Sequence, residues 1–159
     1  MEQEIYPGVT RTWLEAEQIA VYHISAVNVN MLMHWNRHLI EMLKSWNDDA
    51  PCLLVYDLSK GGVSLPYLVF SDFHIDNVVV HNSNKVQIDR MMEARPRLRI
   101  ALALVITTSV SGRIMLGRVQ HDPTVDRMTF DIFFNRENAI DWLKSVRFPG
   151  VDESESAQP

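Results

Sequence analysis

Two stretches near the N-terminus are rich in β-branched and aromatic residues, a composition typical of β-strands. They span residues 9–14 and 18–25, and only residues 15–17 separate them. A connection this short usually joins two antiparallel strands. The pattern therefore predicts an N-terminal β-hairpin.

The apolar spacing then changes to every third or fourth residue, which is the period of a helix with one buried face. Asn28 or Asn30 is suited to cap the start of this helix, because an Asn side chain accepts hydrogen bonds from free backbone amides. The apolar stripe between residues 28 and 46 consists of Leu32, Trp35, Leu39, Met42, Leu43 and Trp46.

Similar stripes predict further helices, and a polar stretch at residues 82–84 is expected to break the chain between two of them. Asn135 is expected to cap the last helix. The predicted helices span residues 64–80, 85–94, 109–119 and 136–146.

Two continuous apolar runs, residues 52–56 and 100–106, are typical of strands buried on both faces of a parallel sheet, and the second predicts a strand over residues 99–106. Residues 127–134 alternate apolar and polar side chains and predict one more strand. Helices between buried strands imply right-handed parallel crossovers. We therefore predict an α/β fold with a mixed, mostly parallel sheet of about five strands, an N-terminal antiparallel hairpin and helices packed on it.

The length of 159 residues fits one domain, expected over residues 1–148. Residues 149–159 are acidic and Ser-rich and are expected to form a disordered tail. Neither a signal peptide nor an apolar run near the ~20 residues of a membrane span is visible, so a cytoplasmic location without an integral membrane segment is expected.

Charge and cysteine content narrow the functional classes. The formal net charge is −5, and the densest basic stretch holds only four arginines, between residues 90 and 99. Nucleic-acid-binding domains usually carry a stronger basic patch, so no nucleic-acid partner is expected. Cys52 is the single cysteine, which excludes an intrachain disulfide and a Cys-based metal cage. Its place in an apolar strand predicts an inert, buried thiol.

Three stretches carry a family resemblance. They read LLVYDLS (residues 53–59), RIALALVI (99–106) and TFDIFFNRENAIDWLKSV (129–146), and Ala139 and Trp142 in the last are distinctive together with Leu143. With the order of elements, they make residues 8–147 similar to the SpoIIAA-like family, which is related to STAS domains. The resemblance implies a non-enzymatic regulatory module that binds a protein partner or a small ligand.

Some STAS domains are switched by phosphorylation of a Ser in the loop after the strand that matches residues 53–58. In this chain Ser64 takes the phosphoacceptor place. The family pattern Asp-Ser-Ser-Gly-Leu is replaced here by Gly-Val-Ser-Leu-Pro at residues 62–66.

The loop after the strand at residues 52–56 is the main candidate site, because open α/β sheets bind ligands outside the carboxyl ends of their strands. A following helix would offer its N-terminus to an anion. The candidate ligand-binding or phosphoacceptor residues are Asp57, Ser59, Gly61, Gly62 and Ser64. The alternative is a structural loop in which Asp57 and Ser59 only satisfy turn amides.

Two groups of histidines are candidate chemical sites. His34 and His38 are one helical turn apart, with Glu41 beyond them, but they lie opposite the apolar stripe. We expect them to cover a solvent-exposed face and predict no metal site. His74 and Asp76 could support acid–base chemistry, together with the nearby Asp72 and His81.

No nucleophile with a fixed partner can be identified, so no catalytic residue is assigned. No glycine-rich nucleotide motif is present, and no cofactor is expected. Two alternatives to the regulatory module stay open. One is a small hydrolase or transferase that uses His74, Asp76 and the Asp57 loop, and the other is an apolar-ligand (lipid) carrier with a cleft beneath residues 64–80.

Trp13, Trp35, Trp46 and Trp142 are expected to pack in the core or between helix and sheet. Other apolar side chains exceed what one buried stripe per helix can hold, and surplus methionine often marks an adaptable contact surface. A homodimer or partner interface is therefore expected at these positions. They are Met31, Met33, Ile40, Met91, Met92 and Met115.

Overall fold

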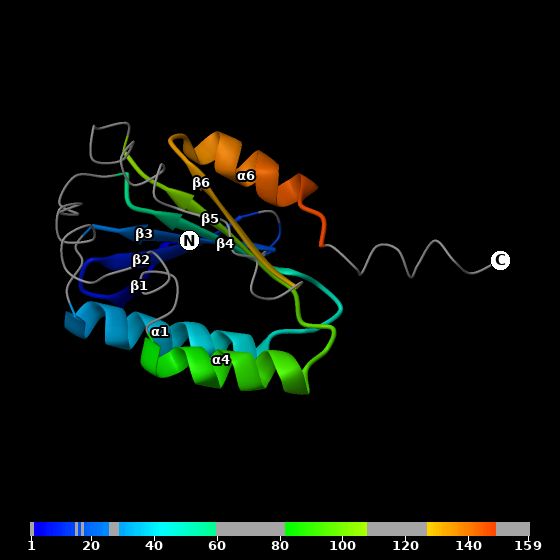
Figure 1. The fold of residues 1–159 in the computed structure, drawn as a ribbon. Coiled ribbons are helices and arrows are strands. Elements are labelled where there is room, and N and C mark those ends of the chain that lie inside the picture. Colours follow the sequence, from blue (N-terminus) through cyan, green and yellow to red (C-terminus); the bar gives the residue numbers. More distant parts are fainter. Residues whose placement is uncertain are drawn as a thin grey trace.

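The computed structural model describes residues 2–14, 16, 18–25, 29–59, 82–107 and 127–148 (Figure 1). Strands and helices follow one another in this part of the chain much as the apolar pattern predicts. The strands are β1 (Glu2–Tyr6), β2 (Val9–Leu14), β3 (Ile19–Ile24), β4 (Cys52–Asp57), β5 (Ile100–Val105) and β6 (Met128–Phe133). The helices are α1 (Val29–Ser45), α4 (Asn82–Ala94) and α6 (Arg136–Ser145).

The strands form one mixed sheet in the order β1-β2-β3-β4-β5-β6. β1, β2 and β3 pair antiparallel, whereas β3, β4, β5 and β6 run parallel. The predicted fold class is therefore confirmed, with six strands in the described sheet. The parallel strands β4 and β5 are buried at every position, as their continuous apolar runs predict.

β1 was not predicted, because its sequence EQEIY has little hydrophobic signal. It lies at the edge of the sheet and pairs with β2 across a tight turn. Gly8 in that turn has a φ of 86°, a conformation that only glycine adopts without steric cost. The Gly8 carbonyl then accepts the backbone N–H of Ser25 at 2.8 Å, which ties the turn to the end of β3.

The helices form two layers around the sheet, with α1 and α4 on one face and α6 on the other (Figure 1). The connections that contain α1 and α4 both advance the same way along the sheet, from β3 to β4 and from β4 to β5. Right-handed crossovers in one direction place their helices on one face. α6 follows the last strand and covers the opposite face.

Side chains alternate between the two faces of each strand and so build two cores. Under α1 and α4, bulky residues such as Tyr22, Trp35 and Leu102 fill the layer. Under α6, the small side chains of Ala101 and Ala103 let the helix approach the sheet closely.

Arginines join the helix ends at the amino edge of the parallel strands. The guanidinium of Arg95 donates to the carbonyls of Leu43 and Trp46 at the end of α1 and pairs with Asp48. Arg127 donates to the carbonyls of Met92 at 2.8 Å and Arg95 at 2.7 Å. Part of the densest basic stretch of the sequence thus holds α1 and α4 together.

Most helix boundaries agree with the prediction, but one is wrong. Residues 82–84 were expected to break the chain, and the structure includes them in α4. Asn and Ser are favoured in the first turn of a helix, where backbone amides lack helical partners. Asn135 caps α6 as predicted, since its side chain accepts the backbone N–H groups of Glu137 and Asn138.

Several predictions fall on residues that the structure does not describe. These are the helices at residues 64–80 and 109–119 and the tail at residues 149–159. Within the described ranges, none of the helices has the length and apolar character needed to cross a membrane.

Candidate functional site

The carboxyl edge of the parallel strands carries a buried acid, Asp57, at the last position of β4. Its side chain is 4 % exposed. A buried carboxylate is costly unless hydrogen bonds or a positive charge compensate it. The groups around Asp57 therefore define the site.

Ser59 and His23 contact the two oxygens of the Asp57 carboxylate. Oδ1 accepts the Ser59 backbone N–H at 3.0 Å and the Ser59 hydroxyl at 2.5 Å. Oδ2 lies 3.2 Å from His23 Nδ1, an ion-pair distance, although the ring is not aligned for a hydrogen bond. Both carboxylate oxygens are thus in contact with polar groups.

The local sequence explains this geometry. Leu58 is buried and donates its backbone N–H to the Val105 carbonyl at 2.9 Å, so the chain leaves the sheet only after it. Asp57 then accepts the amide two residues on, which is the usual Asx turn. As a result Ser59 is the first exposed residue after β4.

The structure brings together two of the five predicted site residues, Asp57 and Ser59. Gly61, Gly62 and Ser64 lie outside the described residues, as do His74, Asp76 and their neighbours. His23 was missed, yet a signal existed. His23 is a polar residue near the end of an apolar strand, and the parallel register pairs it with Asp57.

The histidines of α1 occupy a different environment from the one predicted. The ring of His34 stacks on Tyr6 with centroids 4.8 Å apart. His38 is half-buried, and its Nε2 lies 3.2 Å from the Tyr22 hydroxyl and 3.5 Å from the Arg11 guanidinium. The expected solvent-exposed face is therefore wrong for His38, because the β1–β2 hairpin packs against this side of α1.

Burial and, to a smaller extent, the positive charge of Arg11 lower the pKa of His38. Both effects disfavour the imidazolium form. Glu41, the third residue of the weighed metal site, pairs with Lys44 at 2.7 Å. No group of three His, Cys, Asp or Glu side chains in the described ranges could hold a metal ion.

The predictions for cysteine and tryptophan are confirmed. Cys52 is free and buried, and burial raises the pKa of its thiol to about 12. Trp35 packs on Tyr56, Trp13 stacks on Trp46, and Trp142 contacts a neighbouring ring on β6.

The surplus methionines have a structural explanation. Met31, Ile40 and Met92 are buried, and Met91 packs against the same core. Because α1 and α4 contact each other as well as the sheet, each can bury more than one stripe. The interface predicted at Met31, Ile40 and Met92 is therefore wrong, whereas Met91 is partly exposed and Met33 and Met115 lie outside the side chains described.

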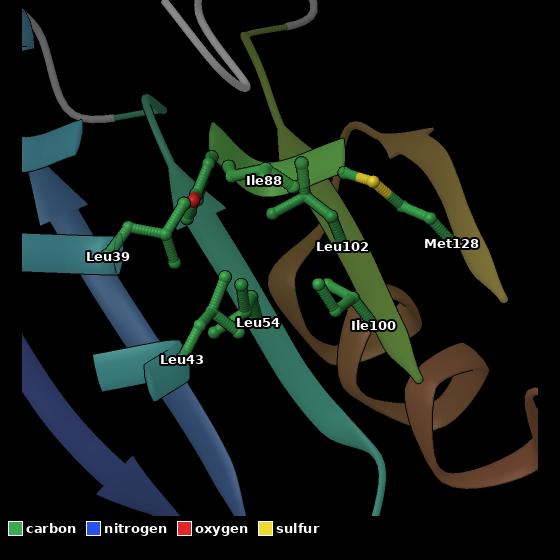
Figure 2. A pocket seen from close by; sticks show the side chains of 8 residues that line it. Leu39, Leu43, Leu54, Ile88, Ile100, Leu102 and Met128 are labelled. Atoms are coloured by element: carbon green, nitrogen blue, oxygen red, sulfur yellow. The ribbon is translucent and has the colours of Figure 1, made fainter. Parts of the chain in front are cut away.

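Figure 2 shows a small apolar cavity between α1, α4 and the sheet. Its volume of about 10 Å³ is at the lower limit for a single water and far below that of a ligand pocket. This space does not support a lipid carrier, and the cleft expected beneath residues 64–80 lies outside the described chain. The lining residues are Leu39, Leu43, Leu54, Tyr56, Ile88, Ile100, Leu102 and Met128.

Comparison with models of known protein families, with curated proteins and with solved structures found no match for this chain. Its function must therefore be inferred from its own residues.

Proposed function

We propose that this chain is a non-enzymatic regulatory module, similar to STAS domains, that binds a protein partner or a small ligand at the carboxyl edge of β4. The observation that supports this is the buried Asp57 carboxylate, which holds the exposed Ser59 hydroxyl at 2.5 Å and lies 3.2 Å from His23. In open α/β sheets this edge is where ligands bind. The lone, buried Cys52 is compatible with a cytoplasmic location.

The order of the three side chains favours binding over nucleophilic catalysis. In a Ser–His–acid triad the imidazole lies between the hydroxyl and the carboxylate and removes the hydroxyl proton. Here the carboxylate of Asp57 lies between the Ser59 hydroxyl and the His23 ring, so the Ser59 hydroxyl donates to Asp57. A hydroxyl held in this way has a fixed direction and can accept a hydrogen bond from a partner.

A small hydrolase or transferase is the second candidate, and the contact between His23 and Asp57 favours it. A carboxylate next to Nδ1 can orient an imidazole so that Nε2 acts as a general base. The group to be activated would then belong to the substrate, because the Ser59 hydroxyl is already bound to Asp57.

Native mass spectrometry of the full chain, purified from its own cell, tests the proposal. We expect a bound ligand or partner on the unmodified protein and its loss in Asp57→Asn and in Ser59→Ala. Asp49→Asn is the matched control, because Asp49 is an exposed acid that pairs with Arg97. It should retain the bound species.

Two results would overturn the binding module. One is a bound species that persists in both site variants. The other is turnover of a generic ester or phosphate-ester substrate by the unmodified chain that is abolished in His23→Gln, which would establish the enzyme instead.

We also propose that the chain forms a homodimer, and the same spectra report its oligomeric state. Met31 and Met92 are buried and so cannot form its interface. Val86 on α4 and Phe134 after β6 are exposed and are better positions to substitute.

A further inference from the structure

Arg11, in the middle of β2, carries a half-buried positive charge on the α1 face of the sheet. One terminal nitrogen donates to Gln3 Oε1 at 2.6 Å, and the other lies 3.5 Å from His38 Nε2. The guanidinium carbon lies 5.0 Å from the ring centroid of Trp13. Nε is buried and has no hydrogen-bond partner, and no carboxylate of the described chain lies within ion-pair distance.

Other arginines of the described chain are compensated by oxygen atoms. Arg95 binds Asp48 and two carbonyls, Arg127 binds two carbonyls, and Arg97 pairs with Asp49. A charge withdrawn from water without an opposite charge lowers stability. Among the described residues, Arg11 therefore has no counterion.

The described acidic side chains of the neighbouring strand β1 and of α1 are directed elsewhere. Glu2 and Glu4 pair in register with Thr12 and Thr10, so they alternate with Arg11 and lie on the other face of the sheet. On α1, Glu41 binds Lys44. The α1 face around Arg11 thus has no nearby carboxylate of its own among these residues.

Imidazoles line the same junction between the hairpin and α1. His38 is half-buried beside Arg11, and the exposed His34 lies one helical turn before it, stacked on Tyr6. His38 Nε2 lies 3.5 Å from the Arg11 guanidinium and 3.2 Å from the Tyr22 hydroxyl, whose proton is directed at Met42 Sδ. An anion on Arg11 could accept a hydrogen bond from an N–H group of the His38 ring.

We propose that Arg11 and His38 form a binding site for an oxyanion, the carboxylate or phosphate group of a ligand, at the junction between the β1–β2 hairpin and α1. The guanidinium supplies parallel N–H donors that match the oxygens of such a group. This site lies on the opposite face of the sheet from Asp57 and is independent of the function proposed for that edge.

NMR titration of the full chain with sodium phosphate, and separately with sodium acetate, tests this site at an ionic strength held constant with sodium chloride. We expect saturable shifts of the Arg11 Nε–H and His38 ring signals and a rise in the pKa of His38 with bound anion. A preference for phosphate identifies a phosphoryl ligand, and a preference for acetate identifies a carboxylate. Either preference supports the proposal.

Arg11→Met should weaken anion binding about tenfold or more, because it removes a charge-assisted hydrogen bond. Arg37→Met is the matched control, since Arg37 is an exposed arginine on α1, next to His38 in the sequence. It should bind within about twofold of the unmodified chain.

The melting temperature of Arg11→Met should equal or exceed that of the unmodified protein, because the lost charge has no counterion among the described residues. If Arg11→Met does not fold, Arg11→Lys retains the charge and the stem and should still weaken binding. Shifts that do not saturate would overturn the site. The site would also be overturned, and Arg11 assigned a structural role, if Arg11→Lys bound the anion as well as the unmodified chain and Arg11→Met had a lower melting temperature.

Discussion

Removal of the Tyr56 hydroxyl should make this protein more stable. Tyr56 is fully buried in β4, and its hydroxyl has no hydrogen-bond partner within the described ranges. Burial raises the pKa of this phenol well above 10.0, so the group stays neutral. An unpaired buried hydroxyl costs about 1–3 kcal/mol relative to water.

Phenylalanine preserves the ring contacts of Tyr56, including the packing on Trp35 at a centroid distance of 4.2 Å. The substitution removes only the hydroxyl group, so the packing volume changes little. Tyr56→Phe should therefore raise the free energy of unfolding by about 1–3 kcal/mol. For a chain of this size, each kcal/mol corresponds to a rise in melting temperature of about 2–4 °C.

Tyr22→Phe is the matched control. Tyr22 lies opposite Tyr56 in the parallel register and is equally buried, but its hydroxyl contacts Met42 Sδ at 3.3 Å and His38 Nε2 at 3.2 Å. Loss of a satisfied hydrogen bond should lower the free energy of unfolding by about 1 kcal/mol. The change in the free energy of unfolding should thus be positive for Tyr56→Phe and negative for Tyr22→Phe.

Urea unfolding followed by tryptophan fluorescence measures both variants, and equal m-values would show that the midpoint reports stability. If Tyr56→Phe destabilises the protein as much as Tyr22→Phe does, the Tyr56 hydroxyl has a partner, such as a buried water, and the reasoning is refuted.

Arg95, His38 and Cys52 allow three further predictions. Arg95→Ala should lower the free energy of unfolding by about 2 kcal/mol or more, because it removes bonds to two helix-end carbonyls and one carboxylate. The exposed Arg97→Ala should cost less than about 1 kcal/mol, and similar losses in chemical denaturation would contradict the assigned role of Arg95. The pKa of His38 is lowered from 6.5 in the folded state, so the unfolded chain binds its proton first and stability should fall as the pH drops below 6.5. His38→Gln should flatten this part of a curve of unfolding free energy against pH. An unchanged slope would show that His38 is not the source of the pH dependence. Cys52, with a thiol pKa of about 12, should resist iodoacetamide at pH 8 and react only after unfolding in guanidinium. Intact-mass measurement detects the added group, and rapid alkylation of the folded chain would contradict the burial of Cys52.

Part of the candidate site was predictable from the sequence. Asp57 and Ser59 follow an apolar run, and the position of such a run in a parallel sheet is enough to place them at a carboxyl edge. Their partner His23 is 34 positions earlier, and only the register of β3 against β4 brings the two side chains together. The same is true of Arg11 and His38, which meet because the hairpin packs on α1.

Local patterns by themselves determined the α/β class, the buried strands β4 and β5, the stripe of α1 and the Asn135 cap of α6. Each depends on neighbouring residues, whose periodicity reports directly which faces are buried. Only the tertiary structure decided that the polar segment β1 pairs as an edge strand and that His38 is buried. It also decided that methionines of α1 and α4 are buried and that Arg95 and Arg127 bind carbonyls at the ends of these helices. These features depend on contacts between distant segments, and their polar or ambiguous residues acquire partners only when register and packing bring the elements together.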